Sequence, residues 1–286
     1  IAKIDFKGNN LIKGIQFDGL RSLGKVNDFA KIYYDEGIDE IIFNDCVASL
    51  YHQEPKFDLI KSFVKDLFIP ITISGGIHHL DHVKQMFDLG ADKVAINTAA
   101  VNDPKLIYDA ARIFGSQSII SSIDIYREVF NANEEDEFFK INLYTHNGKN
   151  KSFKDYKKHI KEVINLGAGE LLLNSINRDG TGDGCDYKLI NLIKDFIEIP
   201  LIYSGGVGSI NDVTDLFKKT NVDAIAAASI FHYNYYKKFK RQKQLSLRLN
   251  SNQDYGNYDF YHDGYGNLEF YNIEKLSVKK LKKNFI

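Results

Sequence analysis

Hydrophobic residues along this chain follow two patterns that alternate. Short runs rich in Ile and Val separate longer stretches in which apolar residues recur at helical spacing. Strands separated by helices predict βα units around a parallel sheet. The runs predict eight strands, at Ala2–Phe6, Glu40–Asp45, Ile69–Ser74, Lys93–Asn97, Ser118–Asp124, Gly169–Ser175, Pro200–Ser204 and Asp223–Ala228. The longer stretches predict helices, for example at Phe57–Leu67, Leu80–Leu89 and Leu189–Ile197, and a helix start at Asp103-Pro104.

Two pairs of similar segments indicate that the chain consists of two related halves. Ile69–Ile77 resembles Ile199–Val207, and each predicts a strand that opens into Ser-Gly-Gly. Gly37–Asp45 resembles Gly167–Ser175 at the same separation along the chain. A repeat of four strands predicts a (βα)8 TIM barrel built from two (βα)4 halves. An open doubly wound sheet is the alternative, but it needs a change in strand order of which the repeat gives no sign.

Two segments interrupt the alternation. Phe138–Tyr144 with His146-Asn-Gly148 predicts a small hairpin inserted after the fifth strand, because Asn-Gly favours a tight β-turn. Residues 234–286 contain a basic run and then many aromatic residues, which suit either a hairpin on the barrel flank or a docking surface for a partner. Ile273–Lys283 predicts a last outer helix. We expect a single barrel domain over residues 1–286, with its core in residues 1–233.

Composition narrows the class of protein. The chain has 286 residues, of which 44% are hydrophobic, and a net charge of -1, so its charge favours neither nucleic acid nor membrane partners. Its two cysteines do not suit a disulfide framework and agree with a reducing cytoplasm. No apolar run approaches the roughly 20 residues of a membrane helix, and no signal peptide is visible. We therefore expect a cytoplasmic protein.

Aspartates end the first and the fifth predicted strands. In TIM barrels the carboxyl ends of the strands carry the active site, and strands one and five face each other across the ring. Asp5 and Asp124 would therefore face each other across one pocket, where different surroundings can separate their pKa values into an acid and a base. The alternative for each is a structural role as a helix cap or loop staple.

Two glycine pairs follow strands in corresponding positions of the two halves. Gly75-Gly76 and Gly205-Gly206 would let backbone amides approach an anion, with the N-terminus of the next helix adding positive potential. Asn97-Thr98 and Ala228-Ser229, on the strands that follow, would complete the two sites. A substrate with a phosphate at each end would span the barrel mouth. Each glycine pair by itself is also compatible with a tight turn.

Other reactive residue types give weaker signals. His78, His79 and His82 cluster after the third strand, and we expect them on the loop and the solvent face of the next helix rather than around a metal. Cys46 and Cys185 lack a neighbouring histidine and aspartate in the spacing of a nucleophile. We expect no metal and no cofactor.

The chain resembles the cyclase subunit of imidazole glycerol phosphate synthase, the HisF family, from Ile1 to about Tyr233. The stretches that carry the resemblance are Ile4–Lys7 with Lys13-Gly14, Gly90–Val101, Phe114–Gln117 with Ile123-Asp124, Gly167–Glu170, Arg178–Thr181 and Ser204–Gly206. The sister family, a phosphosugar isomerase, shares the repeat and both aspartates. It normally lacks the Ile-Asn-Thr-Ala-Ala and Phe-Gly-Ser-Gln forms that stand here, so it is the weaker match.

The resemblance implies a reaction and a partner. Ammonia from a glutaminase subunit, the HisH-like partner of a heterodimer, would cross the barrel and attack a ribulosyl bisphosphate. Ring closure and C–N cleavage would give imidazole glycerol phosphate and an aminoimidazole carboxamide ribotide, a lyase reaction of histidine biosynthesis. By analogy Asp5 and Asp124 are the acid–base pair, and Lys13 supports the loop over the site. Substrate and phosphates would be bound by Gly75, Gly76, Asn97, Thr98, Asn174, Asp179, Gly180, Thr181, Ser204, Gly205, Gly206, Ala228 and Ser229.

The resemblance also implies an ammonia gate at the barrel floor, formed by Glu40, Lys93 and Glu170, although a structural ion network is the simpler interpretation. The chain departs from the family at Asn174, where Thr is usual, and at Asn177, where Asp is usual. Phe17–Arg21 and Ala48–Tyr51 look more like paralogues encoded with surface-polysaccharide genes. Those paralogues are thought to pass ammonia to a sugar amidotransferase that makes an acetamidino sugar. Delivery of ammonia to this second partner is the alternative function.

Overall fold

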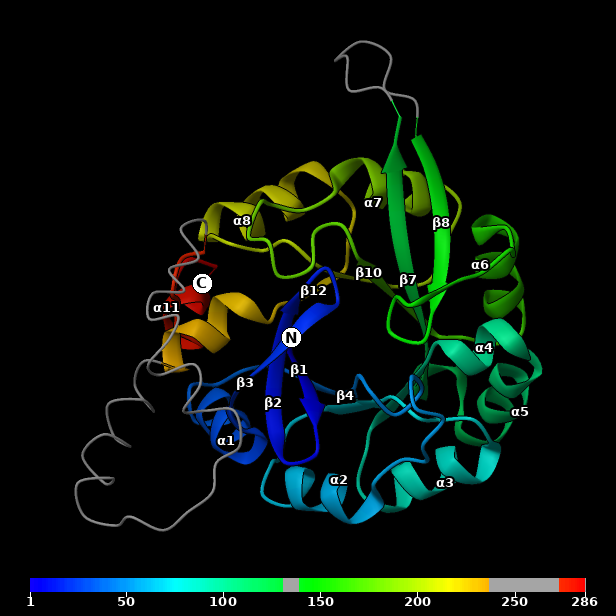
Figure 1. Ribbon diagram of the computed structural model, residues 1–286, viewed down its shortest axis with the longest axis horizontal. Helices are drawn as coiled ribbons and strands as arrows, with labels where there is room; N and C mark the ends of the chain where they lie inside the picture. The colour runs from blue at the N-terminus through cyan, green and yellow to red at the C-terminus, as the bar shows by residue number, and fades with distance from the viewer. Residues whose placement is uncertain (131–138, 237–272, 286) are drawn as a thin grey trace.

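Eight parallel strands form a closed ring in the computed structural model, which describes residues 1–130, 139–236 and 273–285 (Figure 1). They are β1 (Ala2–Lys7), β4 (Ile41–Asp45), β5 (Ile71–Ser74), β6 (Lys93–Ile96), β7 (Ile119–Val129), β10 (Glu170–Ser175), β11 (Leu201–Ser204) and β12 (Ala224–Ala226). The ring closes between β12 and β1, where Lys3 N–H donates to the Ala227 carbonyl at 2.9 Å and Ala227 N–H donates to that of Ile1 at 3.0 Å. The predicted barrel and its eight strands are confirmed, and the open sheet is excluded.

Helices surround the ring of strands (Figure 1). They are α1 (Val26–Asp35), α2 (Phe57–Val64), α3 (Leu80–Asp88), α4 (Thr98–Asn102), α5 (Lys105–Phe114), α6 (Tyr156–Asn165), α7 (Tyr187–Lys194), α8 (Ile210–Lys219), a helix over residues 229–236, and α11 (Val278–Lys282), with a 3-10 turn η1 (Ser116–Ser118) before β7. The three predicted example helices are confirmed: α2 and α3 end earlier than predicted, and α7 both begins and ends earlier. At the predicted helix start, α5 begins at Lys105, and Asp103 Oδ1 accepts the Lys105 N–H at 3.1 Å.

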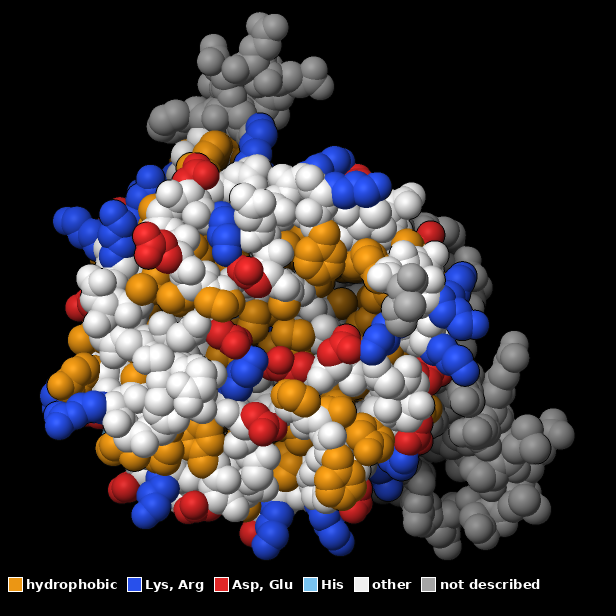
Figure 2. Space-filling view, turned by 180° about the vertical axis from the view of Figure 1, so that it is seen from behind, with side chains coloured by type: hydrophobic (Ala, Val, Ile, Leu, Met, Phe, Trp, Pro, Cys, Tyr) orange, Lys and Arg blue, Asp and Glu red, His pale blue; other side chains and the backbone are white. Residues whose placement is uncertain are grey.

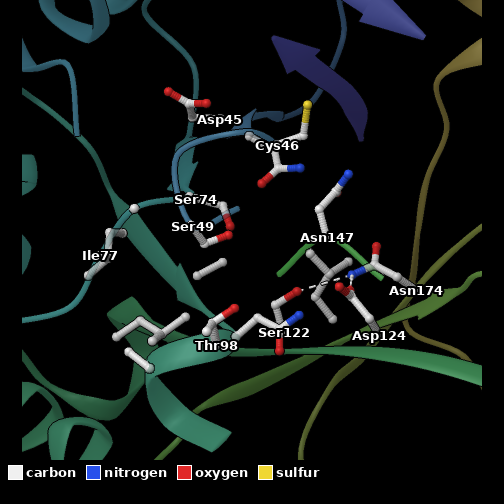
Figure 3. A pocket seen from close by; sticks show the side chains of 18 of the residues that line it. Asp45, Cys46, Ser49, Ser74, Ile77, Thr98, Ser122, Asp124, Asn147 and Asn174 are labelled. Carbon is white, nitrogen blue, oxygen red and sulfur yellow. Dashed lines mark hydrogen bonds between the residues drawn. The ribbon is translucent and has the colours of Figure 1, made fainter. Parts of the chain in front are cut away.

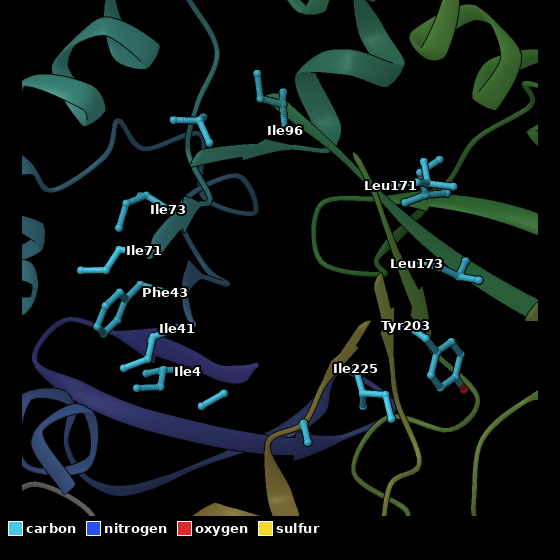
Figure 4. Close-up of a cluster of buried hydrophobic side chains, with 14 of the residues drawn as sticks. Ile4, Ile41, Phe43, Ile71, Ile73, Ile96, Leu171, Leu173, Tyr203 and Ile225 are labelled. Atoms are coloured by element: carbon cyan, nitrogen blue, oxygen red, sulfur yellow. The ribbon is translucent and has the colours of Figure 1, made fainter. Parts of the chain in front are cut away.

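Successive side chains along each strand point to opposite sides of the ring, so the buried apolar residues form two clusters. Side chains such as Ile4, Phe43 and Leu173 point outward, and pack between the strands and the helices in the main cluster (Figure 4). Their neighbours point into the ring and form a smaller cluster of Ile42, Ala95, Ile120, Leu172, Ile202 and Ala226. Burying one Ile or Leu side chain stabilises the fold by about 1.5–3 kcal/mol. The ring is therefore filled by its own inward residues and opens only toward its ends.

The predicted hairpin after the fifth strand is present, and it uses that strand itself. β7 continues beyond the barrel and pairs antiparallel with β8 (Phe139–Thr145), from Asp124 opposite Tyr144 to Val129 opposite Phe139. β8 then turns through His146-Asn-Gly148 into the short β9 (Asn150–Lys151). The loop between the paired Thr145 and Asn150 has positive φ at His146, Asn147 and Gly148, at 53°, 54° and 74°, a conformation that these residue types adopt more readily than most.

A second hairpin follows the first strand and was not predicted. β2 (Asn10–Ile15) pairs antiparallel with β1 and with β3 (Asp18–Lys25). Its turn residues Gln16 and Phe17 have φ of 51° and 62°, in the left-handed region. Neither residue type favours that region, so the usual turn signals of Gly, Asn and Asp are missing there. The hairpin lies over the mouth of the barrel.

The C-terminal segment returns to the barrel beside its first helix. The predicted last outer helix over Ile273–Lys283 is present as the shorter α11. Lys282 Nζ lies 2.6 Å from Asp39 Oδ1, and the Tyr235 hydroxyl donates to the Glu36 carboxylate. The basic run and most of the aromatic segment predicted within residues 234–286 lie outside the described residues. No helix in the described ranges is long and apolar enough to span a membrane.

Candidate active site

The carboxyl ends of the strands surround a polar cavity at the barrel mouth (Figure 3). The main cavity has a volume of about 610 Å³ when the open space at its mouth is included, and residues from six strands line it. Smaller hollows of about 280 and 220 Å³ adjoin it at Ser204–Gly206 and at Asp5 with Lys13. Asp179 lines both smaller hollows, and Asn147 lines the main cavity and the Asp5 hollow. Together they form one elongated site.

The two predicted catalytic aspartates lie at this mouth, on β1 and β7, and both are buried. Asn44 Nδ2 donates to Asp5 Oδ1 at 2.7 Å, and Lys3 Nζ lies 3.9 Å from the same oxygen. Burial alone raises the pKa of the Asp5 carboxyl, but the ammonium groups of Lys3 and Lys13, with the bond from Asn44, lower it below its ordinary value. Asp5 is therefore ionised at neutral pH.

The pKa of the Asp124 carboxyl is shifted in the opposite direction. Burial raises the pKa of its carboxyl to about 6, although Lys3 and a hydrogen bond from Asn174 oppose that rise. Asn174 Nδ2 donates to Asp124 Oδ1 at 2.9 Å and to Ser122 Oγ at 3.1 Å, and dashed lines mark the hydrogen bonds of Asn174 in Figure 3. Two carboxyl groups with pKa values driven apart have the arrangement of an acid and a base.

Lys13 is held by an ion pair at the mouth. Its Nζ donates to both oxygens of Asp179, at 2.6 and 2.7 Å, and both side chains are buried. Burial lowers the pKa of the Lys13 ammonium, but Asp179 and Asp5 raise it above its ordinary value. The Asp179 carboxylate is thus neutralised by Lys13. This pair fastens β2 to the loop after β10.

The first predicted phosphate end contains Gly75, Gly76, Asn97 and Thr98, which all line the main cavity. A Cβ at Gly75 would lie 2.2 Å from the Asp45 carbonyl oxygen, and φ at Gly75 is +97°, so glycine is required there. The Thr98 hydroxyl accepts the His146 N–H at 3.0 Å and so holds the β8–β9 turn beside the cavity.

The second predicted phosphate end lies across the mouth. Gly180, Ser204, Gly205, Gly206, Ala228 and Ser229 line the smaller hollow with Asp179. A Cβ at Gly206 would lie 2.1 Å from the Gly184 carbonyl oxygen, so the backbone approach again needs glycine. Thr181 does not line the hollows described above. Its hydroxyl donates to the Arg178 carbonyl and accepts the Asp183 N–H, which makes it a loop residue.

The three predicted gate residues meet at the opposite end of the barrel. Lys93 Nζ lies 3.3 Å from Glu40 Oε2 and 2.8 Å from Glu170 Oε1. Burial lowers the pKa of the Lys93 ammonium, but the two glutamates raise it above its ordinary value. Figure 2, seen from behind the view of Figure 1, shows acidic and basic side chains meeting near the centre of one face. The apolar ring of Ile42, Leu172 and their neighbours separates this charged floor from the mouth.

The two departures from the family have different surroundings. Asn174 lies inside the site, between Lys3, Ser122 and Asp124. Asn177 lies outside it: its amide donates to the Arg127 carbonyl at 3.0 Å and accepts the Arg127 N–H at 2.7 Å. Asn177 therefore joins the loop after β10 to β7, and Asn174 is the departure that bears on chemistry.

Several lining residues were missed from the sequence, among them Lys3, Phe17, Ser122 and Asn147. Strand alternation is a signal for Lys3 and Ser122, because they stand two positions before Asp5 and Asp124 on the same face. Phe17 and Asn147 enter from hairpin turns. Their place depends on how the hairpins fold over the mouth, for which the local sequence contains no signal.

The histidine cluster differs in part from its prediction. His78 and the exposed His79 lie on the loop before α3, as predicted, and His78 lines the main cavity. His82 is buried, at 6% exposure, so it does not lie on the solvent face of that helix. Burial and the neighbouring histidines lower the pKa of His78 below its ordinary value. Among the described residues, no group of three His, Cys, Asp or Glu side chains is arranged to hold a metal ion. Burial raises the pKa of the Cys185 thiol to about 12 and that of Cys46 well above its ordinary value, which makes both poor nucleophiles.

Comparison with known proteins identifies a matching family and several relatives of this chain. The family model described as "Histidine biosynthesis protein" matches residues 1–237. Relatives named imidazole glycerol phosphate synthase subunit HisF include one from Thermococcus onnurineus, 38% identical over 87% of this chain and 97% of its own. Another, from Lactococcus lactis subsp. cremoris, is 40% identical over 82% of this chain and 87% of its own. A third, from Legionella pneumophila, is 42% identical over 74% of this chain and 96% of its own.

Proposed function

Because this chain belongs to the histidine biosynthesis protein family, we propose that it is the cyclase subunit of an imidazole glycerol phosphate synthase. It is then a lyase that uses ammonia to convert a ribulosyl bisphosphate to imidazole glycerol phosphate and an aminoimidazole carboxamide ribotide. The observation that carries this proposal is the pair Asp5 and Asp124, buried at one mouth with pKa values driven in opposite directions.

The two glycine turns determine how we place the substrate. Gly75, Gly76, Asn97 and Thr98 hold one phosphate, and the hollow at Gly180 and Ser204–Gly206, with Ala228 and Ser229, holds the other. Backbone N–H groups at such turns and helix starts bind phosphate oxygens without a metal. The sugar chain then lies across the middle of the mouth, beside both aspartates. Asp179 contributes by holding Lys13, and Thr181 by supporting its loop.

The carboxyl groups of Asp5 and Asp124 transfer protons during this reaction. Ammonia adds to the ketone carbon of the ribulosyl group, and the oxygen leaves as water when the imine forms. Asp5, ionised at neutral pH, accepts a proton from the attacking nitrogen. Asp124, with a pKa of about 6, is protonated in about a tenth of molecules at pH 7 and donates to the leaving oxygen. Such proton transfers accelerate a step by about 10²–10⁴-fold.

The ammonia source is a glutaminase subunit that docks on the barrel floor. Support comes from Glu40, Lys93 and Glu170, which place three charged groups at the centre of that end. The relatives are named as subunits, which agrees with a heterodimer. We place the complex in the cytoplasm, because Cys46 and Cys185 are both free thiols, as a reducing compartment maintains them.

Turnover with ammonium salt tests the cyclase directly. The purified protein, given the ribulosyl bisphosphate and ammonium chloride, is expected to form both products, measured by chromatography and mass spectrometry. Asp5→Asn and Asp124→Asn are each expected to lower kcat by about 10²–10⁴-fold with the circular dichroism spectrum unchanged. Asp58→Asn, in the first turn of α2, is the matched control and should keep the wild-type rate.

The proposal fails if the folded wild-type protein forms neither product at any ammonium concentration. Direct conversion of the aminoaldose substrate without ammonia would instead identify the sister isomerase. Transfer of ammonia to a sugar amidotransferase would identify the surface-polysaccharide paralogue. The relatives described above carry the synthase name, so neither alternative is favoured.

A further inference from the structure

A buried lysine lies between the two aspartates. Lys3 is 4% exposed and stands on the inward face of β1, two positions before Asp5. It lines the main cavity, and its Nζ is 3.9 Å from Asp5 Oδ1 and 3.0 Å from Asn174 Oδ1. A buried ammonium is costly unless it is paired, and here the nearby Asp5 carboxylate and the hydrogen bond to Asn174 compensate its burial. No role for Lys3 follows from the reaction as described above.

Lys3 determines which way the Asn174 amide faces. An ammonium group only donates hydrogen bonds, so the amide oxygen of Asn174 must face it. The amide nitrogen must then face the other way, where it donates to Asp124 Oδ1 at 2.9 Å and to Ser122 Oγ at 3.1 Å. With Asn174 turned over, two sets of donors would face each other. Through the Asn174 amide, Lys3 thus determines which group faces Asp124 as a hydrogen-bond donor.

This orientation distinguishes the two oxygens of Asp124. Oδ1 accepts from Asn174 and is the poorer place for a proton, so a proton on this carboxyl resides on Oδ2. Asp124 lines the cavity, so Oδ2 is the oxygen available to a substrate there. At the same time the Lys3 charge favours the ionised form of Asp5. One lysine therefore acts on both carboxyl groups, in different ways.

We propose that Lys3 is a positioning residue that assigns the two aspartates their separate roles, keeping Asp5 as the base and orienting Asn174 so that Asp124 presents its proton to the substrate. The proposal rests on the proposed cyclase function for the meaning of those roles. The contacts themselves do not depend on it.

Other charged groups also face the pair and must be counted. Lys13 on β2 acts on Asp5 but is bonded to Asp179, so its charge is shared. Asp179, after β10, acts on Asp124 in the same direction as Asp5 does. Two more groups are buried near Asp5: His232, in the helix over residues 229–236, and Cys46, after β4. Both remain uncharged at neutral pH, because burial lowers the pKa of His232 to about 3 and raises the pKa of Cys46. Among these described groups, Lys3 alone contacts both Asp5 and Asn174.

Two substitutions separate the two effects. Lys3→Met keeps the length of the side chain and removes its charge, and Asn174→Leu keeps the shape of the amide and removes its bonds. In the pH profile of kcat/KM, Asp5 sets the acidic limb and Asp124 sets the alkaline limb. Lys3→Met should move both limbs to higher pH. It should also lower kcat/KM at the optimum by about tenfold or more. Asn174→Leu should move the alkaline limb alone. Lys31→Met, at an exposed position on α1, is the control and should move neither.

Carbon-13 NMR titration of the aspartate carboxyl groups, without substrate, gives a readout independent of turnover. In Lys3→Met the resonances of Asp5 and Asp124, assigned with the Asp→Asn variants, should both titrate at higher pH than in the wild type. Unchanged titrations in a folded Lys3→Met protein would overturn the proposal, as would an Asn174→Leu variant that moves both limbs. If Lys3→Met fails to fold, Asn174→Leu decides alone. Shifted titrations in a protein without turnover would support the network and reject the cyclase function.

Discussion

Asp5 and Asp124 are the same residue type at corresponding strand ends, yet their neighbours drive their carboxyl groups in opposite directions. Both are buried, so desolvation favours the protonated form of each. Cations and a hydrogen bond outweigh that effect at Asp5 and do not at Asp124. The difference lies in which groups the strands bring within reach. It shows why the residue type at a strand end predicts a candidate and leaves its role open.

The raised pKa of Asp124 has a consequence for stability. Its folded-state value of about 6 exceeds the unfolded value of 3.8, so ionisation destabilises the fold as pH rises from about 4 to 6. Asp124→Asn removes that cost and should increase the free energy of unfolding at pH 8 by about 2–3 kcal/mol, an upper estimate from the pKa difference. Urea denaturation at pH 8 and at pH 4 measures it, and the gain should disappear at pH 4.

Asp5→Asn is the matched comparison for that measurement. It removes the partner of Lys3 and one of the charges that act on Lys13, so it should lower stability at pH 8. If both Asp→Asn variants change stability in the same direction at pH 8, the opposite pKa directions inferred for the two carboxyl groups are wrong.

The sequence predicted the site residues at strand ends better than those that enter it sideways. Asp5, Asp124 and the two glycine pairs lie at the mouth because eight strands end there. Lys3 could also have been found, since strand alternation places it on the face of Asp5. The orientation of Asn174 could not, because it depends on side chains from three strands that meet only in the folded barrel.

At the scale of elements, the alternation of strands and helices was a strong signal, and the turns were a weaker one. Every predicted strand is present, and each carries buried apolar residues, such as Ile41–Phe43 in β4 and Leu171–Leu173 in β10. Helix ends differ by a few residues, as at α2, which ends at Val64 rather than Leu67. The β2–β3 hairpin escaped prediction because Gln16 and Phe17 adopt a backbone conformation that their side chains do not favour.

That hairpin places Phe17 at the mouth, where we expect it to close the site over its substrate. Phe17 is 8% exposed and lines the main cavity, and its ring lies 5.5 Å from Lys3 Nζ and against the backbone of Gly148. Phe17→Ala removes the wall between the two hairpins, so substrate should be held less well. We expect KM to rise about tenfold with a smaller change in kcat.

Steady-state kinetics with ammonium chloride measures this effect. Phe153→Ala, at a fully exposed position with the same change of side chain, is the control and should leave KM unchanged. An unchanged KM in Phe17→Ala would show that the hairpin tip does not contact the substrate.

At the scale of the whole molecule, charged groups gather at both ends of the barrel and an apolar ring separates them. Lys93 joins Glu40 and Glu170 at the floor, and Lys3 joins Asp5 and Asn174 near the mouth. The repeat in the sequence predicted this layout in outline, because a barrel of two similar halves places strand starts at one end and strand ends at the other. The grouping of Glu40, Lys93 and Glu170 came from the resemblance to a known family, and both ion pairs of Lys93 agree with it. The pattern of strands alone does not predict these contacts, because β4, β6 and β10 come together only when the ring closes.

A gate at the floor predicts that coupling to the glutaminase depends on Lys93 while the cyclase chemistry does not. Lys93→Met leaves Glu40 and Glu170 facing each other without a cation, so they should repel each other and loosen the floor. With the glutaminase subunit and glutamine, product formation should fall about tenfold or more, and more glutamate should form per product. With ammonium chloride alone the rate should stay near wild type, because added ammonia enters at the mouth. Lys105→Met, exposed on α5, is the control. A parallel fall of both rates would mean that the three charges are only a structural ion network.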